Sequence, residues 1–184
     1  MMRKFVLSLA FGLMMTPQAL AQKVTLALDW FLNPDHAPIL VALVDGNFAR
    51  HGLDVSIIEP ADPNDPPKLV AAGVMDLAIT YQPNLHMQVD QGLPVMRVGT
   101  LIGQPLNILL ALGDGPVETI ADLKGRKIGY SVGGFEEALL GAMLEKHGLQ
   151  LSDVTLVNVN FSLAPSLMAG QVDAVIGAYR NFEM

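Results

Sequence analysis

Short apolar runs and stretches with helical spacing alternate along this chain. Residues 24–28 form a compact apolar run typical of a buried strand. Apolar positions over residues 37–53 then repeat at helical spacing as far as Gly52, and residues 54–59 favour a second strand. The turn-rich stretch 62–67 precedes a predicted helix over 68–73, and residues 76–80 predict a third strand.

The same order of elements returns in the second half. After a Gly- and Pro-containing connection over 111–125, the predicted elements are a strand at 127–132, a loop and helix at 133–149, a strand at 154–160, a short helix at 164–170 and a strand at 173–179. The stretch "GVMDLAITYQPN", which begins at Gly73, recurs as "GQVDAVIGAYRN" from Gly170. The pattern predicts a duplicated β-α-β-α-β unit.

Such a unit builds a parallel sheet with helices on its faces and ligands at the carboxyl ends of its strands. The fold class is therefore α/β, with two lobes, each a mainly parallel sheet flanked by helices. Two lobes leave a cleft between them, which is a preferred place for a small-molecule site. Each copy of the repeated stretch delivers one tyrosine to that cleft, Tyr81 and Tyr179.

Two aspartates of the repeat have a structural interpretation. Asp76 and Asp173 each follow a glycine by three positions and open a predicted strand. Aspartates in such positions commonly bond nearby backbone amides. We read both as turn residues.

The N-terminus changes the picture of where the protein works. Arg3 and Lys4 precede an apolar run over residues 5–15, and Ala19-Leu20-Ala21 is a small-x-small cleavage site. The run is shorter than the roughly 20 residues that a membrane-spanning helix needs. We predict an export signal over residues 1–21 and a periplasmic product.

Charge and cysteine content exclude several classes of function. The 184 residues carry 11 Lys and Arg against 18 Asp and Glu, a net charge of −7, and contain no cysteine. An acidic chain without a basic run is a poor partner for nucleic acid or anionic membranes. Without cysteine there is no disulfide, no thiol nucleophile and no thiolate metal site. We expect a monomer that binds a small molecule, with no catalytic residue, no metal and no cofactor.

The loop after the first strand, "LDWFLNPDHAP", holds three candidate binding residues. An exposed indole at Trp30 is explained best by stacking on a flat ligand. Asn33 offers both a donor and an acceptor, although Asn-Pro is also an ordinary turn. His36 suits either a donor to a ligand or a cap before the helix.

The loop "SVGGFEEAL" places Gly133 and Gly134 at the start of a helix. Free amides and the helix dipole at such a point favour an anion or a polar carbonyl. A phosphate is disfavoured, because acidic residues follow where a lysine and Ser/Thr would stand. Glu136 is either a ligand contact or a residue that favours the helix N-terminus.

The end of the sequence, "AYRNFE", supplies Tyr179, Asn181 and Glu183 where the chain would recross to the first lobe. A carboxylate at Glu183 suits an amino group or a protonated ring of a ligand.

These motifs, together with "PADPNDPPKLVAAG" and "VNVNFSLAPSLMAGQVDAVIGAYRNFE", resemble the periplasmic formylaminopyrimidine-binding proteins of ABC importers. The resemblance covers residues 24–183, and the wider family includes fungal thiamine pyrimidine synthases and alkanesulfonate binders. It implies a type II periplasmic binding-protein fold, a thiamine-precursor pyrimidine as ligand, and an inner-membrane permease with its ATPase as partners. It also implies ring stacking by Trp30 and Tyr179, with polar contacts from Asn33, Tyr81, Gly133, Gly134 and Glu183.

By the same resemblance, the lobes should span residues 22–105 and 106–178, and residues 179–184 should begin the second crossing between them. Family members are longer, and their C-terminal portion returns to complete the first lobe. We therefore expect a fragment whose first lobe exposes an apolar patch and is poorly stable.

The fungal relatives provide an alternative function, because they are enzymes that use pyridoxal phosphate, a histidine and a cysteine-rich motif with iron. The absence of cysteine and the export signal argue against enzymatic activity here. Lys68 could match the lysine that holds pyridoxal phosphate, but a solvated surface lysine is the simpler interpretation. A binder of another solute, such as an alkanesulfonate, and a sensor module with the same cleft are further alternatives.

Overall fold

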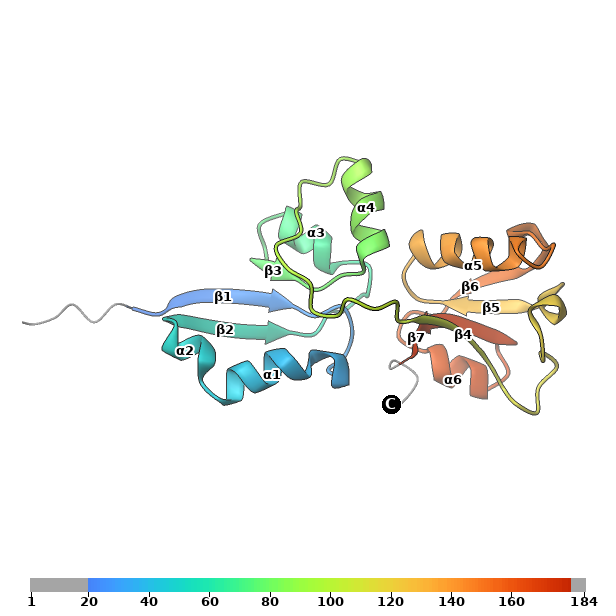
Figure 1. Cartoon of the computed structure of the whole chain (residues 1–184), viewed down its shortest axis with the longest axis horizontal. Coiled ribbons are helices and arrows are strands. Elements are labelled where there is room, and N and C mark those ends of the chain that lie inside the picture. Colours follow the sequence, from blue (N-terminus) through green and yellow to red (C-terminus); the bar gives the residue numbers. More distant parts are fainter. Residues whose placement is uncertain (1–19, 180–184) are drawn as a thin grey trace, which may run out of the picture.

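The computed structural model describes residues 20–179, which form two α/β lobes connected by an extended segment between α4 and β4 (Figure 1). The first lobe contains, in order, β1 (Gln22–Ala27), η1 (Pro34–His36), α1 (Ala37–Val44), α2 (Asn47–Arg50), β2 (Leu53–Ile58), α3 (Pro66–Ala71), β3 (Leu77–Ala78) and α4 (Gln82–Asp90). The second lobe contains β4 (Asn107–Ala111), η2 (Ile120–Leu123), β5 (Lys127–Tyr130), α5 (Phe135–Glu145), η3 (Leu151–Asp153), β6 (Thr155–Asn158), α6 (Leu163–Met168) and β7 (Ala174–Ala178).

The strand order confirms the duplication. The first sheet has the order β2-β1-β3 with parallel pairing throughout. The second sheet has the order β4-β7-β5-β6, so its parallel part, β6-β5-β7, repeats the first sheet strand for strand. Helices lie on both faces of each sheet, with α1 opposite α3 in the first lobe and α6 opposite α5 in the second (Figure 1). The predicted α/β fold class is confirmed.

The repeated aspartates join the third strand of each unit to its first strand. The Asp76 carboxylate accepts hydrogen bonds from the Thr25 backbone N–H and from Thr25 Oγ1, both at 2.7 Å. Asp173 accepts from the Lys127 backbone N–H at 2.8 Å. The predicted partners were nearby amides, yet these lie on β1 and β5, the central strands of the parallel part. Parallel pairing brings them beside the aspartates despite the separation in sequence.

Several elements differ from those expected. The helix predicted over residues 37–53 is divided into α1 and α2, because Gly46 adopts a left-handed φ of 68° between them. The third strand shrinks to the two residues of β3. Helix α4 and strand β4 were not predicted at all. Strand β4 pairs with β7 in the antiparallel sense, whereas the other strand pairs of the second sheet within residues 20–179 are parallel.

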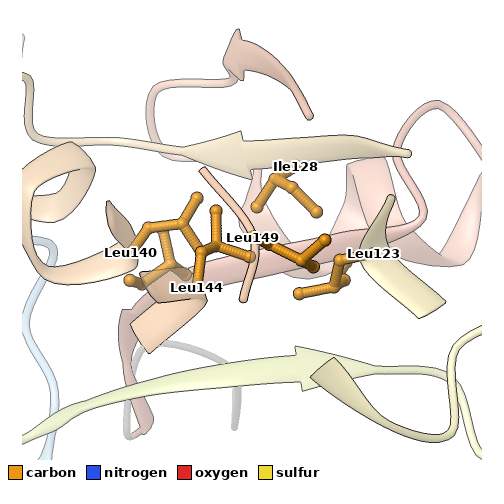
Figure 2. Packing of buried hydrophobic residues seen from close by; sticks show 7 residues of the cluster. Leu123, Ile128, Leu140, Leu144 and Leu149 are labelled. Atoms are coloured by element: carbon orange, nitrogen blue, oxygen red, sulfur yellow. The ribbon is translucent and has the colours of Figure 1, made fainter. Parts of the chain in front are cut away.

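The second lobe has a closed apolar core. Leu140 and Leu144 of α5 pack against Leu123, Ile128 and Leu149, and all but Leu149 are fully buried (Figure 2). Leu140 and Leu144 lie four positions apart on α5, so both project from the same face of the helix into this core. Burial of this size is the main source of stability in a small domain.

A second cluster of buried side chains connects the two lobes. Trp30 comes from the loop after β1, yet it packs against Leu163, Leu167, Val172 and Val175 of the second lobe. Among residues 20–179, the two clusters of buried apolar side chains therefore belong to the second lobe, with Trp30 as the contribution of the first.

The first lobe exposes large apolar side chains, as expected. Helix α1 is strongly apolar, but none of its residues, all within the described range, is buried. Val44 is 83% exposed and Leu43 40%. An apolar groove of about 460 Å³ runs between α1 and the sheet, lined by Leu28, Leu32, Leu40, Leu43, Ile57, Ile58 and Glu59.

The segment that joins the two lobes enters the second lobe beside the end of β7. The first residue of β4, Asn107, pairs with the last residue of β7, Ala178. One step further, the Tyr179 backbone N–H donates to the Leu106 carbonyl at 3.1 Å. No helix within residues 20–179 combines the length and apolar character needed to cross a membrane.

Candidate binding cleft

The carboxyl ends of the parallel strands in the two lobes face each other (Figure 1). The loops that follow these strands therefore meet, as parallel α/β units require. A pocket of about 210 Å³ lies there, where helix α4 approaches helix α5. Its lining residues come from both lobes and are mostly polar: Asn64, Lys68, Asn84, Met87, Gln88, Gln91, Gly133 and Gly134.

Asn64 connects the lobes by hydrogen bonds. It lies in the loop between β2 and α3, and its Oδ1 accepts from the Gly133 backbone N–H at 2.9 Å. Its Nδ2 donates to the Ser131 carbonyl at 3.3 Å and to Asp62 Oδ1 at 2.9 Å. The Asn64 backbone N–H also donates to Asp62 Oδ1, and these bonds lower the pKa of the Asp62 carboxyl. The Gly133 amide, predicted to face a ligand, is thus engaged by Asn64.

Aromatic stacking adds a second contact between the lobes. Tyr81 is the N-cap residue of α4, and its ring stacks on Phe135 at the start of α5. The ring centroids are 5.0 Å apart and the planes are inclined by 26°. Phe135 is buried, so this pair fixes the approach of α4 to α5. Tyr81 therefore lies at the interface of the two lobes, although it does not line the pocket.

A buried carboxylate binds the start of the Ser131–Gly134 loop by hydrogen bonds. Glu136 is 2% exposed, and its Oε2 accepts from the Ser131 and Val132 backbone N–H groups at 2.8 and 2.9 Å. Burial raises the pKa of Glu136 to about 7, against the two hydrogen bonds, which lower it. Glu136 therefore acts at the start of α5, where it binds the amides of the preceding loop, and this agrees with a structural role at the helix N-terminus. A contact between Glu136 and a ligand stays a prediction.

Gly134 is required by the shape of the pocket wall. Its φ of 88° is unfavourable for other residues, and an added Cβ would come within 3.1 Å of Met87 Cε. Its backbone N–H donates to Glu137 Oε2 at 2.7 Å. Gly134 therefore allows the close approach of α4 to the loop. Both Gly133 and Gly134 line the pocket, and their contact with a ligand stays a prediction.

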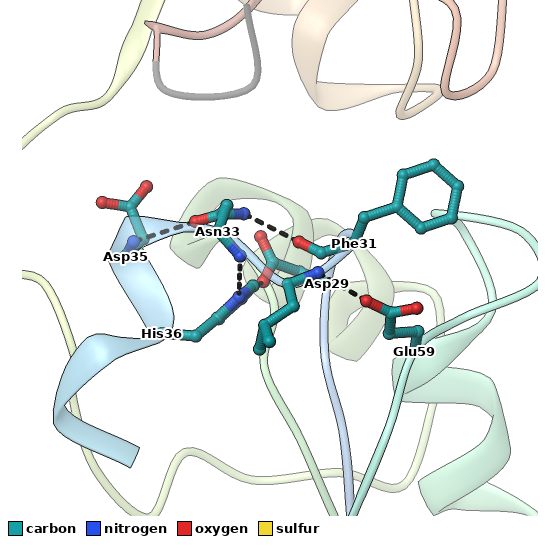
Figure 3. Close-up of polar contacts among 7 residues, drawn as sticks. Asp29, Phe31, Asn33, Asp35, His36 and Glu59 are labelled. Carbon is teal, nitrogen blue, oxygen red and sulfur yellow. Dashed lines mark hydrogen bonds and ion pairs between the residues drawn. The ribbon is translucent and has the colours of Figure 1, made fainter. Parts of the chain in front are cut away.

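The loop after β1 is a separate hydrogen-bonded unit (Figure 3). Asn33 Oδ1 accepts from the Asp35 N–H at 2.9 Å, and Asn33 Nδ2 donates to the Phe31 carbonyl at 3.0 Å. The Nδ1 atom of His36 accepts from the Asn33 N–H at 3.2 Å, which leaves Nε2 as the protonated nitrogen facing Asp29 at 2.9 Å. Asn33 and His36 are buried and cap η1 here. Ligand contacts for them stay predictions.

The expectation of an exposed indole at Trp30 is wrong. The side chain is 1% exposed and meets Phe161 edge-on, with ring centroids 4.8 Å apart. Apolar residues of the second lobe surround it, which sequence periodicity could not show because they lie more than a hundred positions away. The indole Nε1 is buried without a hydrogen-bond partner among the described residues. Stacking of Trp30 on a ligand stays a prediction.

The structure brings some predicted residues together and leaves others apart. Tyr81, Gly133 and Gly134 meet where α4 approaches α5. Tyr179 directly follows β7, beside Leu106 at the end of the segment that joins the two lobes. Asn181 and Glu183 lie outside the described residues, as does most of the predicted export signal.

Sequence reasoning missed most of the pocket wall. Asn84, Met87, Gln88 and Gln91 lie on or directly after α4, which was not predicted. A proline in the first turn of that helix, Pro83, was the available signal. The sequence predicts a turn at Asn64 and favours a solvated surface position for Lys68. Its side chain is 56% exposed and pairs with Asp65 at 3.4 Å, but it also lines the pocket.

The paired lobes and the cleft between them define the class of fold, that of the periplasmic binding proteins. The chain resembles the periplasmic aliphatic sulphonate binding protein SsuA of Escherichia coli, with a TM-score of 0.67 and 19% identity over 88% of this chain and 55% of that chain. It also resembles the alkanesulfonate-binding protein SsuA of Xanthomonas axonopodis pv. citri, with a TM-score of 0.70 and 22% identity over 86% of this chain and 55% of that chain. At these identities the likeness shows the fold alone.

The chain belongs to the NMT1/THI5-like family, whose model matches residues 33–184. A Haemophilus influenzae relative named for thiamine biosynthesis is 56% identical over 96% of this chain and 57% of its own length. The formylaminopyrimidine-binding protein of Halalkalibacterium halodurans is 38% identical over 88% of this chain and 49% of its own length. The 4-amino-5-hydroxymethyl-2-methylpyrimidine phosphate synthase of Schizosaccharomyces pombe is 32% identical over 84% of this chain and 44% of its own length. The chain spans about half the length of these relatives, and the resemblance read from its motifs is confirmed.

Proposed function

We propose that this chain is the ligand-binding part of an exported solute-binding protein that captures a thiamine-precursor pyrimidine and delivers it to an ABC permease and its ATPase. The observation that carries the proposal is the polar pocket at the junction of two duplicated lobes. A fold of this kind encloses a small solute by closing one lobe on the other. The 38% identity to a formylaminopyrimidine-binding protein supports a pyrimidine as that solute.

The pocket wall has groups that suit an aminopyrimidine. Gln88 Oε1 is buried and has no hydrogen-bond partner within residues 20–179, so it is an acceptor available to a ligand amino group. Met87 offers a polarizable thioether that packs against aromatic rings. The volume, about 210 Å³, is below the roughly 300 Å³ typical of drug-sized sites and suits a single ring.

Calorimetric titration with formylaminopyrimidine, thiamine and an alkanesulfonate tests the proposal. We expect the pyrimidine to bind with a Kd near the micromolar range, which corresponds to about −8 kcal/mol. Gln88→Ala should weaken binding about tenfold, since it removes an acceptor from the pocket. Gln171→Ala, at an exposed position outside the pocket, is the matched control and should leave the Kd unchanged. Binding of the sulfonate alone would rule out the pyrimidine.

A second candidate function is a synthase-like reaction with pyridoxal phosphate. The synthase relatives favour it, and so does the position of Lys68 on the pocket wall. Covalent attachment of pyridoxal phosphate to Lys68 would produce a new absorbance band that Lys68→Arg abolishes and Lys146→Arg does not. We expect no such band, because Lys68 is largely exposed and paired with Asp65.

A further inference from the structure

The Ser131–Gly134 loop offers one acceptor and one donor to the first lobe. The Ser131 carbonyl accepts from Asn64 Nδ2 at 3.3 Å, and the Gly133 N–H donates to Asn64 Oδ1 at 2.9 Å. The chemistry of the loop fixes how the Asn64 amide is oriented. A backbone N–H can only donate and a carbonyl can only accept, so oxygen faces Gly133 and nitrogen faces Ser131.

We propose that Asn64 occupies the place of the ligand, and that this loop selects molecules carrying a hydrogen-bond acceptor next to a donor, as an aminopyrimidine does. The ring nitrogen of such a molecule would accept from the Gly133 N–H, and its amino group would donate to the Ser131 carbonyl. Ligand binding then requires Asn64 to leave. The inference rests on the proposed function, because both concern the same pocket.

The similar geometry of a carboxamide and an aminopyrimidine supports the replacement of Asn64 by the ligand. In a carboxamide, one carbon separates the acceptor oxygen from the donor nitrogen. In a 4-aminopyrimidine, one carbon likewise separates the ring nitrogen from the amino nitrogen. The two edges therefore satisfy the same pair of backbone groups at the same spacing.

The position of Asn64 also allows it to leave. Its bond to Ser131, at 3.3 Å, is at the long end of the hydrogen-bond range. Asp62 Oδ1 accepts from both the backbone N–H and the Nδ2 of Asn64, so it holds the residue in its loop when the contacts with the second lobe are exchanged.

There is room for a ring beside this edge. Gly133 and Gly134 line the pocket, and no side chain projects from either into it. A Cβ on Gly133 would face Asn64 Oδ1 at 3.8 Å, and one on Gly134 would face Met87 Cε at 3.1 Å. The buried acceptor Gln88 Oε1 belongs to the same wall and is available to a second amino hydrogen.

Calorimetry with 4-aminopyrimidine and pyrimidine on the full chain tests the proposal. Asn64→Ala removes the internal competitor, so 4-aminopyrimidine should bind about tenfold more tightly than to the unsubstituted chain. Pyrimidine, which lacks the donor, should gain less. Asn47→Ala, at the start of α2 and outside the pocket, is the matched control and should change neither Kd. Weaker or unchanged binding of 4-aminopyrimidine by Asn64→Ala would overturn the inference.

The amide resonance of Gly133 provides an independent measurement. In Asn64→Ala, acetamide restores the missing carboxamide edge and should shift this resonance, as should 4-aminopyrimidine. Asn64→Ser serves the same purpose if the alanine variant does not fold. No shift with either probe overturns the inference. If both probes shift the resonance while formylaminopyrimidine fails to bind the unsubstituted chain, the inference stands and the proposed function is lost.

Discussion

The two lobes share one strand order but differ in how their helices pack. In the second lobe, α5 buries Leu140 and Leu144 against the sheet. In the first lobe, α1 occupies a comparable position after the first strand, yet none of its described residues is buried. Duplicated topology therefore does not guarantee a duplicated core.

Sheet pairing and core packing have different requirements. The strand order depends on backbone pairing and on contacts such as those of Asp76 and Asp173, which both lobes have. A core also needs apolar surface on two facing elements. In the first lobe the groove beside α1 stays open, and Leu43 on its wall is 40% exposed. Stability should accordingly be concentrated in the second lobe.

The largest expected effect comes from the same substitution in each lobe. Leu144→Ala deletes a fully buried side chain and should lower the free energy of unfolding by about 2–5 kcal/mol. Leu43→Ala deletes a side chain that borders solvent and should cost below about 1 kcal/mol. Chemical denaturation followed by circular dichroism gives both values. Equal losses would show that the first lobe is packed as tightly as the second.

The pH dependence of stability should depend on Glu136. The pKa of this carboxyl is raised to about 7 in the folded chain, above its ordinary value of 4.5. The folded state therefore binds the proton more tightly than the unfolded state. The stabilisation is complete below about pH 4.5 and is lost as pH rises through about 7, by up to about 3 kcal/mol.

Glu136→Gln keeps an oxygen for the Ser131 and Val132 amides but cannot titrate, so its melting temperature should change less between pH 5 and pH 8. Glu145→Gln, an exposed position on the same helix, is the control. The same pH dependence in both variants and the unsubstituted chain would contradict the role given to Glu136.

A smaller effect should distinguish the equivalent aspartates. Asp76 accepts two hydrogen bonds from Thr25, whereas Asp173 accepts one from Lys127 and lies 3.7 Å from Arg126. Replacing a carboxylate by an amide weakens bonds of this kind. Asp76→Asn should therefore lower the melting temperature more than Asp173→Asn does. The opposite order would show that the ion pair with Arg126 matters more than the second hydrogen bond.

The smallest effect concerns the fluorescence of Trp30, the only tryptophan in the chain. Because its side chain is 1% exposed, we expect emission typical of an apolar site and little quenching by acrylamide. A pyrimidine that stacks on the indole would change this emission on titration, and one that binds only beside Gly133 would leave it nearly constant. The measurement therefore decides between the role predicted from the sequence and the packing seen in the structure.

Local pattern was sufficient for the repeated strands and for the loop glycines, because a strand run or a Gly-Gly pair is readable within a few residues. It was insufficient for Trp30, whose surroundings come from the other lobe. It also missed α4, where apolar residues are sparse, and with it Met87 and Gln88 of the pocket. The position of Asn64 against Gly133 depends on how the lobes meet, which no local pattern encodes.

The hydrogen bond between Tyr179 and Leu106 has a mechanical consequence. It fastens the segment that joins the lobes to the end of β7, so this segment cannot swing freely where it enters the second sheet. Rotation of one lobe against the other should therefore take place in the part of the segment before Leu106. A slight change of angle there would become the widest travel in the parts of the first lobe farthest from it.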